Sequence, residues 1–89
     1  MKIETWNGHE IRFVWHDGEW WAVAKDVAKA LGYRDAEKMT RFIDPEEKDT
    51  HIVGTLGGKQ KMTVISETGI YEAILNSRRQ EAKEFKRWV

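Results

Sequence analysis

Residues 10–23 constrain the fold most, because runs of alternating polar and apolar side chains flank a strong turn. Asp17-Gly18 is a residue pair typical of two-residue β-hairpin turns, in which the chain reverses between antiparallel strands. The run before this turn and residues 19–23 after it therefore predict a hairpin, and residues 3–6 predict an added strand. The first run consists of apolar Ile11, Phe13 and Trp15 and polar Glu10, Arg12 and His16.

The tryptophans of this hairpin create a packing problem. With a two-residue turn, Trp15 faces Trp20 across the strands and Val14 faces Trp21, so both faces of the ribbon carry aromatic surface. Only one face can point into the core of a chain of 89 residues. The other face needs a covering helix or a partner chain, and a homodimer would supply the latter.

From Ala24 the apolar period changes from two to about 3.6 residues, which indicates an amphipathic helix. Gly32 ends this helix, because glycine tolerates the left-handed backbone conformation after a last helical turn, and Tyr33 can fold back over that turn. The predicted inward stripe is Val27, Ala28 and Leu31, and the charged residues off the stripe are Lys25, Asp26 and Lys29.

A second helix is predicted over residues 36–43. Asp35 is a suitable N-cap, and Asp44-Pro45 ends the helix because proline cannot continue it. The spacing of the apolar side chains places Met39, Phe42 and Ile43 inward.

The second half of the chain predicts another hairpin and two more helices. Residues 50–56 and 59–65 predict strands joined by a Gly57-Gly58 turn, and Ser66 is a good N-cap for the helix that follows. Ser77 and Gln80 fit the capping box of a last helix. The predicted inward residues are Ile70, Tyr71, Ile74 and Leu75 in the first of these helices, and Ala82, Phe85, Trp88 and Val89 in the last.

Together these elements predict an α+β fold, in which two β-hairpins pack with about four short helices in a single compact domain, residues 1–89. The chain contains no cysteine, so packing must hold it together, as in an intracellular protein, and we expect a cytoplasmic location. No apolar run approaches the roughly 20 residues that span a bilayer, so no membrane association is expected. The formal net charge is zero, so any contact with nucleic acid must come from local basic patches.

The sequence does not predict an enzyme. His9, His16 and His51 stand far apart with no metal-ligand spacing, and the favoured interpretation is that they are solvated or structural. The glycines at 54, 57 and 58 belong to a hairpin pattern, and no Gly-Lys-Ser/Thr follows them as a phosphate loop requires. We therefore predict no catalytic residues, no metal and no cofactor.

Basic residues in three segments are the candidates for DNA contact. The first predicted helix and Gly32 resemble the first half of a helix-turn-helix, although the turn that follows is one residue too long for the simplest form. Each segment also has a structural interpretation: a solvated helix pair, an edge strand protected by lysines, and a solvated helix face of mixed charge. The candidates are Arg34, Lys38 and Arg41 in the second helix region, Lys59, Gln60 and Lys61 at the hairpin tip, and Arg78 and Arg79 near the C-terminus.

Four ordered blocks of the chain resemble the N-terminal domain of the BRO family, found in large DNA viruses, phages and prophages. They are WAVAKDVAKALGY at residues 21–33, GGKQ at 57–60 with Met62, VISETGIY at 64–71, and SRR at 77–79 with the AK, FK and WV pairs at 82–89. This resemblance implies a compact α+β domain at the N-terminus of a longer protein, tied to DNA binding in viral BRO proteins and to antirepressor action in phages. Gln80 departs from the family, which often has a proline there.

Two functional hypotheses follow. The first is a DNA-binding, transcription-regulating module of a prophage antirepressor-type protein, which contacts double-stranded DNA through the local basic patches. The second is a protein-interaction module that binds and inactivates a phage repressor without contacting DNA. Its binding surface would be the aromatic face around Trp15, Trp20 and Trp21.

Overall fold

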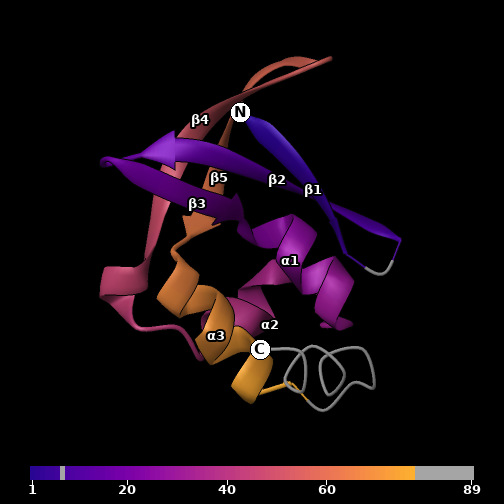
Figure 1. Ribbon diagram of the computed structural model, residues 1–89, viewed down its shortest axis with the longest axis vertical. Coiled ribbons are helices and arrows are strands. Elements are labelled where there is room, and N and C mark those ends of the chain that lie inside the picture. Colours follow the sequence, from indigo (N-terminus) through magenta and orange to yellow (C-terminus); the bar gives the residue numbers. More distant parts are fainter. Residues whose placement is uncertain (7, 78–89) are drawn as a thin grey trace.

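A five-stranded antiparallel sheet joins the two predicted hairpins (Figure 1). The computed structural model describes residues 1–6 and 8–77. In chain order its elements are β1 (Lys2–Trp6), β2 (His9–His16), β3 (Glu19–Val23), α1 (Ala24–Leu31), α2 (Ala36–Thr40), a 3-10 turn η1 (Pro45–Glu47), β4 (Lys48–Thr55), β5 (Gly58–Ile65) and α3 (Glu67–Leu75).

The first hairpin forms in the predicted register. Trp15 lies opposite Trp20, and Val14 lies opposite Trp21. Asp17 and Gly18 have backbone φ angles of 48° and 80°, the left-handed conformations that a two-residue turn of this kind needs at both central positions. The added strand also forms, because β1 pairs with β2 over its whole length.

The link between the two hairpins was not predicted. β3 pairs with β5 through Ala22 opposite Ile65 and Val23 opposite Val64, which gives the strand order β1-β2-β3-β5-β4. In Figure 1 the β4–β5 hairpin rises steeply across the direction of β2 and β3. The two hairpins are therefore halves of one strongly twisted sheet.

The sheet buries apolar residues on both faces. The helices cover one face, where Ala22 and Ile65 belong to the main core with residues of all three α-helices. On the other face Val53 of β4 is buried with residues of β2, β3 and β5, so the second hairpin covers the first. This second cluster consists of Val14, Trp21, Val23, Val53 and Val64. The second hairpin therefore covers this face, and no partner chain is needed there.

The predicted capping of the first two helices is confirmed. Gly32 ends α1 with a φ of 79°, and the Asp35 side chain accepts a hydrogen bond from the backbone N–H of Lys38 at 2.8 Å. However, α2 ends at Thr40, three residues before the predicted end. Met39 and Ile43 are buried as predicted, but Phe42 is 53% exposed. Phe42 was wrongly placed inward because it lies beyond the helix, where the helical period no longer applies.

The predicted inward face of α3 is wrong in part. The Ser66 hydroxyl caps the helix as expected, accepting from the N–H of Gly69 at 3.1 Å. Ile70 and Ile74 pack into the core, but Tyr71 and Leu75 are exposed. The buried face instead includes Gly69 and Ala73, whose small side chains let the helix approach the sheet and η1 closely.

The second hairpin turns one residue earlier than predicted. Thr55 pairs with Gly58, so Leu56 and Gly57 form the turn in place of Gly57-Gly58. The fourth predicted helix, with its inward Ala82, Phe85, Trp88 and Val89, lies outside the described residues. The described part of the chain thus has an α+β fold with three α-helices and one short 3-10 turn. None of these helices is both long and apolar enough to cross a membrane.

The close approach of α3 predicts the effect of a methyl group at Gly69. A Cβ there would lie 2.9 Å from the carbonyl oxygen of Glu47 and 3.2 Å from the Cβ of Ile65. We expect Gly69→Ala to lower the free energy of unfolding by about 1–2 kcal/mol, because the added methyl group overpacks the core. This loss should occur even though alanine favours helices more than glycine does. Urea denaturation measures this change. Gly54→Ala is the control, because its Cβ would meet nothing within 4 Å; equal stability of the two variants would contradict the prediction.

Candidate nucleic-acid interface

Three of the predicted DNA-binding residues line one hollow at the end of α1. The hollow has a volume of about 400 Å³, and Arg34, Lys38 and Arg41 contribute its cations. The left-handed turn at Gly32 directs the chain away from α1, and the Asp35 cap starts α2 immediately afterwards. Arg34 precedes this cap, Lys38 lies within α2 and Arg41 follows it, so one tight connection places all three. The remaining lining residues are Gly32, Tyr33, Phe42 and Ser77.

Tyr33 fixes the inner wall of this hollow. Its hydroxyl donates a hydrogen bond of 2.7 Å to the backbone carbonyl of Ala73 in α3, and its N–H donates to the carbonyl of Ala28 in α1 at 2.9 Å. Burial raises the pKa of the Tyr33 hydroxyl above its ordinary value. The hollow is thereby attached to two helices of the core, as well as to the short α2.

The charges in the hollow are poorly compensated. Among the described residues, neither Arg34 nor Lys38 forms a salt bridge with a carboxylate. Arg41 has one partner: its Nη2 lies 3.7 Å from Oε1 of Glu37, and both side chains are mostly exposed, so this pair contributes little. An adjoining hollow is lined by equal numbers of cations and carboxylates, namely Lys25, Lys29 and Arg34 with Asp26, Asp35 and Glu37. Among the residues that the structure describes, the local excess of positive charge therefore lies on the α2 side of Arg34.

The α1–α2 unit differs from a helix-turn-helix that reads bases. α2 has five residues, which is about a turn and a half of helix. A recognition helix places several side chains along the major groove, and α2 offers little length for this. Exposed cations around a hollow are better suited to phosphate contacts, which position a protein on DNA without reading its sequence.

The hairpin tip is a separate basic site. Lys59, Gln60 and Lys61 are exposed on β5, but successive strand residues alternate between faces, so the two lysines share one face and Gln60 lies on the other. Figure 1 shows the tip at the upper end of the molecule and α2 in its lower half. The structure thus does not bring the tip together with the hollow. Arg78 and Arg79 lie outside the described residues.

The predicted aromatic surface is reduced to two tryptophans. Trp15 and Trp20 are 58% and 39% exposed and meet edge to face, with ring centroids 5.2 Å apart. The ammonium group of Lys2 lies 4.9 Å from the centroid of the Trp20 ring. Trp21 is buried in the second cluster, 7% exposed, so it is not available to a partner on this surface.

An ion pair between β2 and α1 was missed by the sequence analysis. The Arg12 guanidinium donates to both carboxylate oxygens of Asp26, at 2.8 and 3.0 Å, and the Arg12 backbone N–H donates to the same carboxylate at 3.0 Å. This hydrogen bonding raises the pKa of Arg12. The sequence analysis placed Asp26 off the apolar stripe and gave it no partner, because no sequence signal links it to a residue 14 positions earlier. The pair attaches α1, and hence the hollow, to the sheet.

The fold and the hollow define a small α+β domain with a localised cluster of cations. Residues 10–89 match the model of the BRO family N-terminal domain, and the chain belongs to this family. This domain is associated with DNA-binding regulatory proteins of the antirepressor type, and it is not a known enzyme family.

A relative from Haemophilus influenzae, described as an uncharacterized protein, is 34% identical over 73 residues. The match covers 81% of this chain but 36% of the relative, so the chain spans little more than a third of that protein's length. No solved structure was found to match the chain.

The Arg12–Asp26 pair predicts a measurable decrease in stability when it is broken. Asp26→Ala leaves the Arg12 side chain, 25% exposed, without its carboxylate, and we expect the free energy of unfolding to fall by about 1–3 kcal/mol. Glu4→Ala is the matched control, because it removes an exposed pair with Lys2 at 3.8 Å and should change stability by less than about 0.5 kcal/mol. Denaturant titration compares the two variants. A decrease no larger for Asp26→Ala than for Glu4→Ala would show that the pair does not hold α1 to the sheet.

Proposed function

We propose that this domain binds double-stranded DNA through phosphate contacts in the hollow between α1 and α2, as the DNA-contacting part of a prophage antirepressor-type regulatory protein. The observation that carries this proposal is the convergence of Arg34, Lys38 and Arg41 on one hollow. The whole chain has no net charge, so general attraction to DNA is weak and binding depends on such a local excess. Membership of the BRO family supports a nucleic acid as partner.

The mechanism is electrostatic attachment to the backbone. Guanidinium groups donate bidentate hydrogen bonds to phosphate oxygens, and Lys38 adds a third positive charge to the hollow. Neither Arg34 nor Lys38 has to break an ion pair with the described residues in order to bind. The hollow therefore supplies affinity and orientation, while sequence preference must come from other contacts.

The hairpin tip and the following arginines are a second proposed contact. Lys59 and Lys61 share one face of a narrow ribbon, which could follow a neighbouring stretch of backbone, with Gln60 on the opposite face. Arg78 and Arg79 come directly after Ser77, which lines the hollow. These four cations are expected to increase the affinity for DNA beyond what the cations of the hollow provide.

The salt dependence of DNA binding tests the proposal. The untagged protein is titrated into a labelled duplex of arbitrary sequence, and fluorescence anisotropy is measured over a range of salt concentrations. The triple variant Arg34→Gln, Lys38→Gln and Arg41→Gln should reduce the slope of log affinity against log salt by about 0.9 for each phosphate that the variant no longer neutralises. Lys2→Gln, which removes one exposed cation of β1, should change the slope little.

Two results would contradict this proposal. One is the absence of wild-type binding to any duplex at low salt. The other is a triple variant that folds, as judged by its circular dichroism spectrum and melting temperature, and keeps the wild-type slope. In the same assay, the double variant Lys59→Gln with Lys61→Gln measures how much the hairpin tip contributes to the salt dependence of DNA binding.

A second function, the binding of a phage repressor protein, is favoured by the exposed Trp15–Trp20 pair. Two adjacent exposed tryptophans are unusual on a monomer surface, and such residues dominate the energetics of protein interfaces. In this case the domain would release repression without touching DNA. Binding through these rings would bury apolar surface and would tolerate high salt.

Trp15→Ser tests this alternative with little risk to folding, because the Trp15 side chain is 58% exposed. The purified repressor of the same prophage should bind the wild-type domain, and Trp15→Ser should weaken binding at least about tenfold, as expected of an interface hot spot. Leu56→Ser is the control, because it removes an exposed apolar side chain at the hairpin tip. Equal affinities of the two variants, measured by isothermal titration calorimetry, would exclude the Trp15–Trp20 surface.

A further inference from the structure

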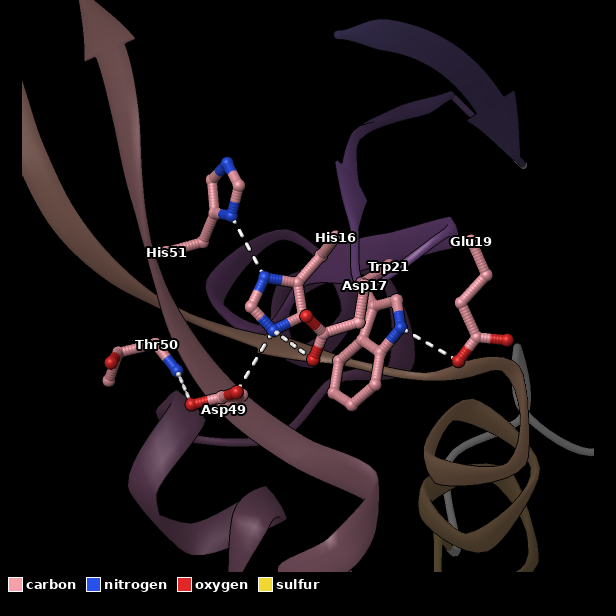
Figure 2. A network of polar contacts seen from close by, with 7 residues as sticks. All are labelled: His16, Asp17, Glu19, Trp21, Asp49, Thr50 and His51. Atoms are coloured by element: carbon pink, nitrogen blue, oxygen red, sulfur yellow. Dashed lines mark hydrogen bonds and ion pairs between the residues drawn. The ribbon is translucent and has the colours of Figure 1, made fainter.

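The fold brings together four titratable side chains that are far apart in the sequence. His16 and Asp17 lie at the end of β2 and in the following turn, and Asp49 and His51 lie on β4 (Figure 2). β2 and β4 are not neighbours in the sheet, because β3 and β5 separate them. The two strands meet across the face where the second hairpin covers the first. The histidine spacing along the chain gave no indication of this convergence.

One imidazole nitrogen and two carboxylate oxygens in this cluster lie close to one another. Nε2 of His16 lies 2.9 Å from Oδ2 of Asp49 and 3.5 Å from Oδ2 of Asp17. The three ligand atoms all lie within 4.8 Å of one another. Ligands bound tetrahedrally at about 2.1 Å from Zn²⁺ are about 3.4 Å apart. For an ion to replace the proton between His16 and Asp49, these two ligand atoms would have to move apart by roughly half an ångström.

The surroundings hold these ligands in place. Nδ1 of His16 lies 3.0 Å from Nδ1 of His51, so His16 can donate its Nδ1 proton to His51 when Nε2 binds an ion. Such a partner on the far side of the ring fixes the tautomer of a metal-binding histidine. The backbone N–H of Thr50 donates to Oδ1 of Asp49 at 2.8 Å, which leaves Oδ2 facing His16.

Trp21 positions the ring of His16 from the side. The two ring centroids are 5.0 Å apart at an interplanar angle of 64°, and the His16 side chain is only 13% exposed. The Trp21 indole is itself held by a hydrogen bond of 2.9 Å to Glu19 (Figure 2). Asp17, by contrast, is 79% exposed, so solvent and an ion can reach the cluster from the side of the turn.

We propose that His16, Asp17 and Asp49 bind a divalent first-row transition metal ion of the Zn²⁺ type, with His51 as the partner that orients His16. The imidazole ligand favours Zn²⁺, Co²⁺ or Ni²⁺ over Mg²⁺ and Ca²⁺, which prefer oxygen ligands. Three protein ligands leave at least one coordination position for water. The bound ion would attach the β2–β3 turn to β4 and so stabilise the contact between the two hairpins. This site is independent of the proposed DNA interface.

Thermal unfolding and calorimetry of the untagged protein test the site with ZnCl₂ and MgCl₂ as probes. Zn²⁺ should bind with a stoichiometry of one and raise the melting temperature progressively as its free concentration exceeds the Kd, because it binds the folded state more tightly than the unfolded chain. Mg²⁺ at the same concentrations should do neither. His16→Gln and Asp49→Asn should abolish the Zn²⁺-dependent shift, whatever their own melting temperatures without metal. His9→Gln is the matched control, because His9 lies at the opposite end of β2 and should leave the shift unchanged.

Two further variants separate ligands from supporting residues. Asp17→Asn should weaken Zn²⁺ binding without disturbing the turn, since asparagine tolerates the left-handed conformation that Asp17 adopts. His51→Gln should lower the affinity for Zn²⁺ by about 10–100-fold, the range for residues that orient a metal ligand. The proposal is overturned if the wild-type protein binds no Zn²⁺ in stoichiometric amount, or if His16→Gln binds it as the wild type does.

Discussion

The pairing of β3 with β5 is the interaction on which the rest of the structure depends. Two residue pairs, Ala22 with Ile65 and Val23 with Val64, join the hairpins into one sheet, and all four side chains are completely buried. Because successive residues face opposite sides of a sheet, this short pairing supplies apolar surface to both cores. The helices pack on one side, and the second hairpin closes over the other.

The proposed binding sites occupy places that this double core leaves at the surface. On the helical side, the tight α1–α2 connection carries Arg34, Lys38 and Arg41 around one hollow, and the Arg12–Asp26 ion pair attaches α1 to the sheet behind it. On the opposite side, the closure of the sheet brings His16 against β4. A neutral chain can in this way concentrate positive charge in one region and carboxylates in another.

Local features of the fold could be predicted from the sequence, because each depends on a few adjacent residues. The Asp17-Gly18 turn, with its pairing of Trp15 and Trp20, and the cap at Asp35 are examples. Contacts between distant segments could not be predicted, as the junction of the hairpins and the approach of His16 to Asp49 show. The orientation of α3 was wrong because large apolar residues were assumed to mark its buried face, whereas Gly69 lies there. The sequence predicted the basic residues of the hollow but not the hollow itself. Its shape depends on the packing of Tyr33 against α3, which is a contact between distant segments.

The proposed DNA contact lies in the α1–α2 hollow. Titration of a short duplex into ¹⁵N-labelled protein, followed by NMR, tests this proposal, because it locates the binding surface residue by residue. If DNA binds in the hollow, the largest chemical-shift changes at low salt should fall on the backbone amides of residues 33–42, and the indole signals of Trp15 and Trp20 should change little. Changes concentrated at Trp15 and Trp20, or none at saturating DNA, would contradict it.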